Sequence, residues 1–165
     1  MPVAEPLSFD DFLLLVGRLN YAWTNTESLF IHLIAGLTRM DKETAVVIFL
    51  TLNTSRARID LVERLSKMTR HSVPERKAIL ALTARMVKLS HLRNRFNHCI
   101  YAFDSEGGHP KTILMRIADR KDTIKMGQIS DIDDEMLTGI SEAIDNLGQL
   151  NRDIWAFVQR HNYPV

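Results

Sequence analysis

The sequence is poor in the features that mark secreted and membrane-embedded proteins. It has one cysteine, Cys99, among 165 residues, which excludes an internal disulfide framework and indicates a reducing compartment. The longest apolar stretches, such as residues 46–50, are far shorter than a bilayer span. The first residues lack the cationic stretch and apolar core of a secretory signal. We therefore expect a cytoplasmic protein without membrane contact.

Clusters of metal ligands are also missing from the sequence. No set of His, Asp and Glu residues has the spacing of a metal site. The acidic run 131–135 lacks the glycine and the ligand spacing of a calcium-binding loop. Acids of this kind are typical of the first turn of a helix. We expect neither a metal nor a cofactor.

Apolar residues make up 45% and charged residues 25% of the chain, as in an ordinary globular domain. We treat residues 1–165 as one domain. The net charge is only +1, but residues 54–98 hold eleven Lys or Arg against three Asp or Glu, a local charge of +8. Such a segment suits a polyanionic partner, although solvated helix faces explain it equally well.

Apolar residues recur at helical spacing over most of the chain. The pattern predicts helices over residues 9–38, with Ser8 as cap, and 41–50, with a third helix after Thr54. A long helix starts near Ser72 and carries its apolar stripe through Phe96 and Ile100. A last helix opens at Ser130 or Asp131 and ends near residue 161.

Alternation with period two replaces the helical pattern between residues 100 and 126, around the Gly107-Gly108 turn. It predicts a small antiparallel hairpin or three-stranded meander. The expected fold is therefore mainly α, an antiparallel bundle of four to five helices, with a β insertion at about 100–128 before the last helix.

Polar residues gather near the end of the predicted helix 72–100. With about 100° of rotation per residue, one polar face holds His91, Asn94, Arg95 and His98. These residues are crowded into two turns, include amides that helices disfavour, and directly precede the switch to strands. We interpret residues 93–98 as the functional centre.

Arg93 differs from its neighbours because it falls on the apolar stripe. A buried arginine needs a partner, and Glu27 on the first helix is our candidate. Asn97 is a supporting position, as is Arg95.

The pattern Arg93-Asn94-x-x-x-His98 resembles the R-N-x-x-x-H motif of HEPN domains, which occur in many prokaryotic toxins and defence ribonucleases. Residues 21–27 also look like the first helix of some uncharacterised bacterial HEPN-like families. The resemblance covers the helical scaffold, but its diagnostic part is only residues 93–98. The β insertion departs from the minimal domain.

The resemblance implies a metal-independent endoribonuclease that uses 2′-OH attack to form a 2′,3′-cyclic phosphate. His98 is then the general base or acid, Arg93 stabilises the phosphorane, and Asn94 orients the phosphate or holds His98. Supporting roles fall to Glu27, His91, Arg95 and Asn97.

The resemblance also implies partners besides RNA. Arg93 and His98 are poorly placed to face each other on one helix, so a homodimer through the motif helix would assemble the site. A cognate antitoxin or regulator is a further expected partner. In one toxin–antitoxin branch a tyrosine stands two residues after the histidine; here that residue is Ile100, so we do not assign that partner.

A non-catalytic function is the main alternative to the ribonuclease. Many HEPN-like bundles have lost activity and serve as dimerisation, nucleotide-sensing or antitoxin-like binding modules. A thiol nucleophile at Cys99 is disfavoured, because sequence neighbours on a helix point about 100° apart and no acidic third member is evident.

Overall fold

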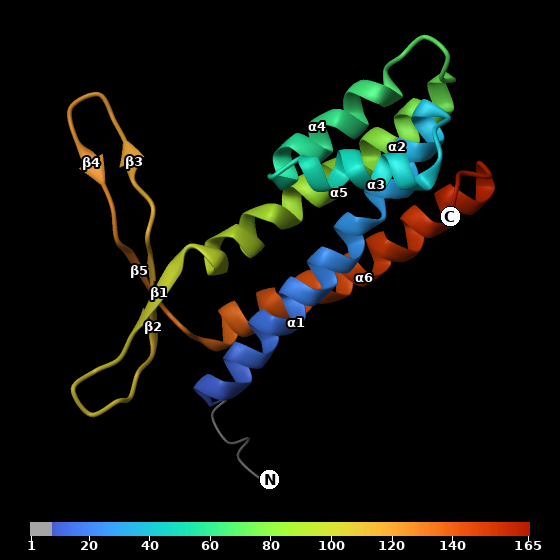
Figure 1. The fold of residues 1–165 in the computed structure, drawn as a ribbon. Helices are drawn as coiled ribbons and strands as arrows, with labels where there is room; N and C mark the ends of the chain where they lie inside the picture. Colours follow the sequence, from blue (N-terminus) through green and yellow to red (C-terminus); the bar gives the residue numbers. More distant parts are fainter. Residues whose placement is uncertain (1–7) are drawn as a thin grey trace, which may run out of the picture. The chain divides into compact units, whose positions relative to one another are not determined.

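The computed structural model describes residues 8–165, which form helices with strands inserted before the last one (Figure 1). The helices are α1 (Phe9–Ser28), α2 (Phe30–Thr38), α3 (Lys42–Thr51), α4 (Ser55–Ser66), α5 (Val73–Asn97) and α6 (Asp134–Arg160). The strands are β1 (Cys99–Ala102), β2 (Lys111–Leu114), β3 (Ala118–Asp119), β4 (Ile124–Lys125) and β5 (Gln128–Asp131). The predicted mainly α fold with a small β insertion is confirmed, and the strands extend over residues 99–131.

Side-chain caps start several helices where the sequence predicts them. Ser8 accepts a hydrogen bond from the backbone N–H of Asp11, and the Asp11 carboxylate accepts one from the backbone N–H of Ser8. Asp41 and Thr54 cap α3 and α4 by accepting hydrogen bonds from the backbone N–H groups of Thr44 and Ala57. These bonds satisfy N–H groups that have no partner inside the helix.

The predicted helix 9–38 is divided at Leu29 into α1 and α2. The hydroxyl of Thr26 donates to the carbonyl of Ala22 and that of Ser28 to the carbonyl of Asn25. Side chains that compete for backbone carbonyls in this way weaken a helix locally. The backbone tightens accordingly, with Leu29 N–H donating to Thr26 O at 3.2 Å.

The last helix begins later than predicted, at Asp134, with Asp133 as its cap. Ser130 and Asp131 belong instead to β5, where they pair with Thr112 and Lys111 of β2. The predicted start at Ser130 or Asp131 was wrong. The acidic residues that suit a first helical turn come directly after a strand, so the acidic run does not mark where the strand ends and the helix begins.

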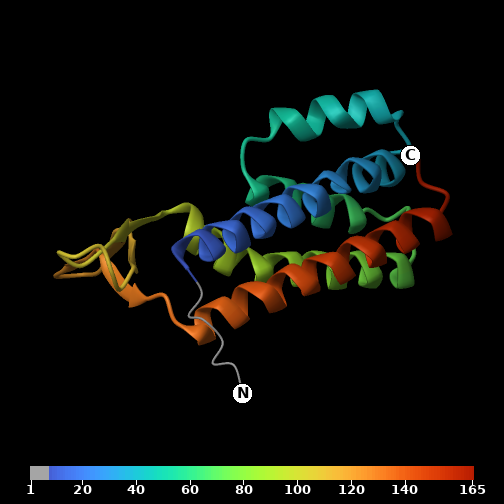
Figure 2. The same ribbon diagram turned by 90° about the horizontal axis from the view of Figure 1, so that it is seen from below.

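The described residues divide into two units, and α1, α5 and α6 contribute to both. The helical unit comprises residues 22–90 and 145–165. Its core is fully buried and includes Trp23, Phe30, Leu33, Ile34, Leu37, Ile79, Met86, Leu147 and Leu150. Thr26 of α1 donates a hydrogen bond to the carbonyl of Leu147 of α6. Helix α3 lies at the margin of this unit (Figure 2) and buries only Ala45 and Phe49.

The sheet unit comprises residues 8–21 and 91–144. Its antiparallel sheet has the order β1-β2-β5, and β3 and β4 form a separate hairpin. The β1–β2 turn and the β3–β4 hairpin extend in opposite directions from this sheet (Figure 1). Aromatic side chains join the sheet to the helices: Phe12 of α1 makes edge-to-face contacts with Phe96 and Tyr101, both at 5.7 Å between ring centroids.

Candidate functional site

The polar residues at the end of α5 are divided between a helix and a turn. Helix α5 ends at Asn97, and His98 lies in the turn that leads into β1. The carbonyl of His98 accepts a hydrogen bond from the backbone N–H of Met115 at 2.7 Å. The prediction that the helix runs through Ile100 was therefore wrong, because pairing with β2 takes over. Ile100 is 49% exposed and not part of the core.

Arg93 is held by hydrogen bonds to two amide side chains. Asn20 uses its amide nitrogen to bond the carbonyl of Val16. With the Asn97 amide turned so that its nitrogen and its oxygen both have partners, Oδ1 of Asn20 accepts from that nitrogen at 3.1 Å. The oxygen of Asn97 then accepts from Nε and Nη2 of Arg93, at 2.8 and 3.1 Å. Arg93 also donates to Oδ1 of Asn94 at 3.2 Å. Asn97 therefore links Arg93 to α1, a role that the sequence did not indicate.

Glu27 belongs to the helical unit, and its predicted partner Arg93 belongs to the sheet unit. The ion pair that the structure shows for Glu27 is with Arg58 of α4, at 2.8 Å. Glu27 is only 6% exposed, so this carboxylate needs the guanidinium beside it. The structure thus supplies a structural partner for Glu27 that the sequence analysis missed.

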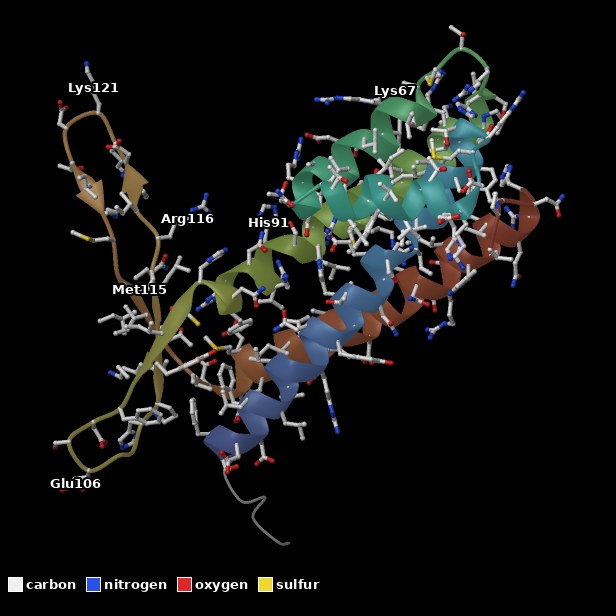
Figure 3. The ribbon with its side chains drawn as sticks, in the orientation of Figure 1. Lys67, His91, Glu106, Met115, Arg116 and Lys121 are labelled. Atoms are coloured by element: carbon white, nitrogen blue, oxygen red, sulfur yellow. The ribbon has the colours of Figure 1, made fainter. Side chains whose placement is uncertain are left out.

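The other predicted residues line one cleft of about 210 Å³. Helix α5 and the following turn contribute His91, Asn94, Arg95 and His98, and the β segment contributes Leu114, Arg116, Gln128 and Ser130. Figure 3 shows Arg116 extending from the hairpin segment on the side where His91 lies on α5. Arg93 is not among the residues that line this cleft.

The strand register explains why the sheet presents these side chains. Cys99, Leu114 and Gln128 lie side by side across β1, β2 and β5, and Ser130 follows Gln128 by two residues. Side chains two residues apart on a strand point to the same face. The sequence analysis did not identify Arg116, although the alternation predicted for residues 112–118 puts it on the face of Leu114.

The cleft is electropositive. Arg95 and Arg116 line it, and none of the described residues that line it is acidic. The nearby acids Asp131, Asp133 and Glu135 line a separate hollow, which shares Arg95 and Ser130 with the cleft. Imidazole side chains transfer protons near neutral pH, and guanidinium groups bind phosphate oxygens. The cleft thus brings together side chains of the kinds that transfer protons and bind anions.

Cys99 makes local contacts instead of lining the cleft. It is partly buried, and its Sγ lies 3.3 Å from the carbonyl of Phe96, to which it donates. Burial, and then the hydrogen bond and charge interaction with Cys99, raises the pKa of Tyr101 above its ordinary value. Cys99 is therefore part of the sheet, close to its aromatic residue Tyr101, in keeping with a packing role.

The described residues offer neither a metal site nor a membrane-spanning helix. Among residues 8–165, no three His, Cys, Asp or Glu side chains are grouped so that they could hold a metal ion. No helix in this part of the chain is both long and apolar enough to cross a membrane. Neither a protein-family model, nor a curated protein, nor a solved structure matches the chain.

Proposed function

We propose that the chain is an endoribonuclease in which His91 and His98 form an acid–base pair. The observation that carries the proposal is that both imidazoles line one small cleft together with Arg95 and Arg116. Cleavage of RNA by its own 2′-OH needs a proton acceptor, a proton donor and positive charge at the phosphate. The cleft supplies all three from protein side chains.

In the proposed reaction, one neutral imidazole accepts the proton of the 2′-OH as its oxygen attacks the adjacent phosphorus. The bond from phosphorus to the 5′-oxygen breaks, and the other imidazole, in its protonated form, donates a proton to that leaving oxygen. The products are a 2′,3′-cyclic phosphate and a 5′-hydroxyl end.

The proposed roles of the arginines differ from those that the resemblance to HEPN domains implies. Arg95 and Arg116 line the cleft, so we assign them to the negative charge that develops on the phosphorane. Asn94 lines the cleft and accepts a hydrogen bond from Arg93. We therefore assign Arg93 as a positioning residue, which acts through Asn94 and Asn97.

Membership of the HEPN superfamily, a toxin or defence role, a cognate antitoxin and a cytoplasmic location remain part of the proposal. A homodimer through the motif helix also stays a prediction. Because one chain already brings His91 and His98 to one cleft, the proposed chemistry does not require a second copy. Light scattering during gel filtration measures the oligomeric state directly.

The experiment that tests this function is cleavage of mixed RNA in the presence of EDTA. We expect new 2′,3′-cyclic phosphate ends with wild type, and a loss of rate of about 100- to 10,000-fold with His98→Ala, as is usual for a general acid or base. His109→Asn is the matched control, because His109 is exposed in the β1–β2 turn. Cleavage that is absent from wild type, or that survives His98→Ala, contradicts the proposal.

A second candidate is a binding module that holds RNA without cleaving it. It is favoured by one observation: the arginine of the motif is hydrogen-bonded to Asn97 and does not line the cleft. Retained RNA binding without new phosphate ends supports this candidate over the enzyme.

A further inference from the structure

A groove along the β3–β4 hairpin adjoins the cleft. This groove has a volume of about 580 Å³ and shares Leu114, Arg116 and Gln128 with the cleft. Beyond the shared residues it is lined by Ala118, Arg120, Lys125 and Met126. The two hollows are therefore adjacent within the sheet unit.

Three cations of the hairpin segment lie on the face that lines the groove. Every second residue from Leu114 to Arg120 lines the groove, and Lys125 lies opposite Ala118 in the strand pairing. The three cations Arg116, Arg120 and Lys125 thus face the groove. Asp119 falls on the alternate position, and no described residue that lines the groove is acidic.

We infer that a single strand of RNA extends from the cleft along this face of the hairpin, with its phosphates on Arg116, Arg120 and Lys125. The inference rests on the proposed function, and it names the substrate as single-stranded RNA longer than the scissile dinucleotide.

Spacing supports an extended strand. Arg116 and Arg120 are four residues apart, about 13 Å along an extended backbone, so they reach different phosphates of one strand. The side chains of Leu114 and Met126 offer apolar surface to bases, and Met126 is 72% exposed. Unpaired bases can use such a surface, whereas those of a duplex are stacked inside it.

A triple variant, Arg116→Gln, Arg120→Gln and Lys125→Gln, tests the groove, with Lys121→Gln as its matched control. Lys121 lies at the tip of the same hairpin and does not line the groove (Figure 3). Binding of a fluorescent oligouridylate is measured by anisotropy over a range of salt concentrations, in a His98→Asn background that prevents cleavage. Far-UV circular dichroism checks that the variants fold.

We expect the triple variant to bind the oligomer about tenfold more weakly at low salt. Its plot of log affinity against log salt is expected to be shallower by about 2, since each neutralised phosphate of a single strand contributes about 0.7. The control is expected to match the parent. Equal affinity of triple variant and control, or tighter binding of duplex than of single-stranded RNA, overturns the inference.

Turnover separates this inference from the function on which it rests. With His91 and His98 intact, we expect Arg120→Gln with Lys125→Gln to lower kcat/KM for the oligomer but not for the dinucleotide UpA, which occupies only the cleft. Equal kcat/KM losses for both substrates overturn the groove and leave the enzyme standing. RNA binding that depends on the groove, without cleavage of either substrate, overturns the enzyme and leaves the groove standing.

Discussion

At the scale of single residues, two arginines of α4 differ sharply in what they contribute. Arg58 pairs with buried Glu27, donates to the carbonyl of Phe49 and lies 4.1 Å from the centroid of the Phe49 ring. We expect Arg58→Ala to lower the free energy of unfolding by about 3 to 5 kcal/mol, because it leaves a buried carboxylate without its counter-charge. Urea unfolding measures this loss.

The neighbouring Arg56 is the control. It pairs with Asp60 one turn away, and its side chain is 72% exposed, so Arg56→Ala should cost less than about 1 kcal/mol. Replacing both members of the buried pair, with Glu27→Leu and Arg58→Met, should recover much of the stability lost in Arg58→Ala. Similar losses in Arg56→Ala and Arg58→Ala would show that burial of the pair has no energetic consequence.

Gly36 and Gly17 make a second residue-scale comparison. A methyl group at Gly36 of α2 would overlap the ring of Tyr163, whereas one at Gly17 of α1 meets no atom of the described residues 8–165 within 4 Å. We expect Gly36→Ala to destabilise the protein by about 1 to 3 kcal/mol through overpacking. Gly17→Ala should stabilise it by up to about 1 kcal/mol, since alanine favours helices. Thermal unfolding shows whether each substitution raises or lowers the stability. A stabilising Gly36→Ala would contradict the close contact between Gly36 and Tyr163.

At the scale of elements, the C-terminal segment is held to the start of α5. The hydroxyl of Tyr163 donates to Glu75, and His71 lies 3.4 Å from the same carboxyl group. Burial opposes ionisation of the Glu75 carboxyl group. The hydrogen bond from Tyr163 outweighs this effect together with the charge and the hydrogen bond of His71, so the pKa of Glu75 lies below its ordinary value of 4.5. Burial and then Glu75 raise the pKa of Tyr163 above its ordinary 10.0.

Both shifts determine how this contact responds to pH. Folding favours the Glu75 carboxylate, so its stabilisation is present above pH 4.5 and is lost as the pH falls through the lowered pKa. Folding favours the neutral Tyr163 phenol, so its stabilisation is present below pH 10.0 and is lost as the pH rises through the raised pKa.

The resulting prediction concerns Tyr163→Phe. The difference in unfolding free energy between wild type and this variant should be largest between pH 4.5 and pH 10.0. It should shrink below and above this range, as Glu75 gains its proton in acid and Tyr163 loses its proton in alkali. Tyr21→Phe is the control, because Tyr21 is 71% exposed, and it should show no such profile. Urea unfolding across pH tests this, and a difference that does not vary with pH contradicts it.

Elements also show where sequence reasoning succeeds. Periodicity and capping residues predicted most helix starts, because both signals are local. The stop of α5 at Asn97 is not local, since it depends on the bond between His98 and Met115 and on strand pairing with β2. The same non-local pairing places Ser130 and Asp131 in β5 rather than in the last helix.

At the scale of the whole molecule, the candidate site joins two segments that the sequence analysis treated separately. Helical angles grouped His91, Asn94, Arg95 and His98 on one side. The structure brings all four to one cleft, although His98 lies in the turn after α5, where helical angles do not apply. The alternation in residues 112–118 placed Arg116 on the same face as Leu114. That this face lines the cleft with Gln128 and Ser130 could not be predicted, because the strand register follows from tertiary packing. The ion pair between Glu27 and Arg58 was not predicted either, because the contact between α1 and α4 also follows from tertiary packing.

The measurement that tests the central claim most directly compares two substrates in His91→Ala and His98→Ala. UpA needs a proton on its leaving oxygen, whereas uridine 3′-(4-nitrophenyl phosphate) has a leaving group that departs without one. We predict that both variants lose UpA cleavage, and that only the variant without the general acid recovers cleavage of the nitrophenyl ester. Full UpA activity in either variant, or no recovery of nitrophenyl ester cleavage by either one, would contradict an acid–base pair formed by His91 and His98.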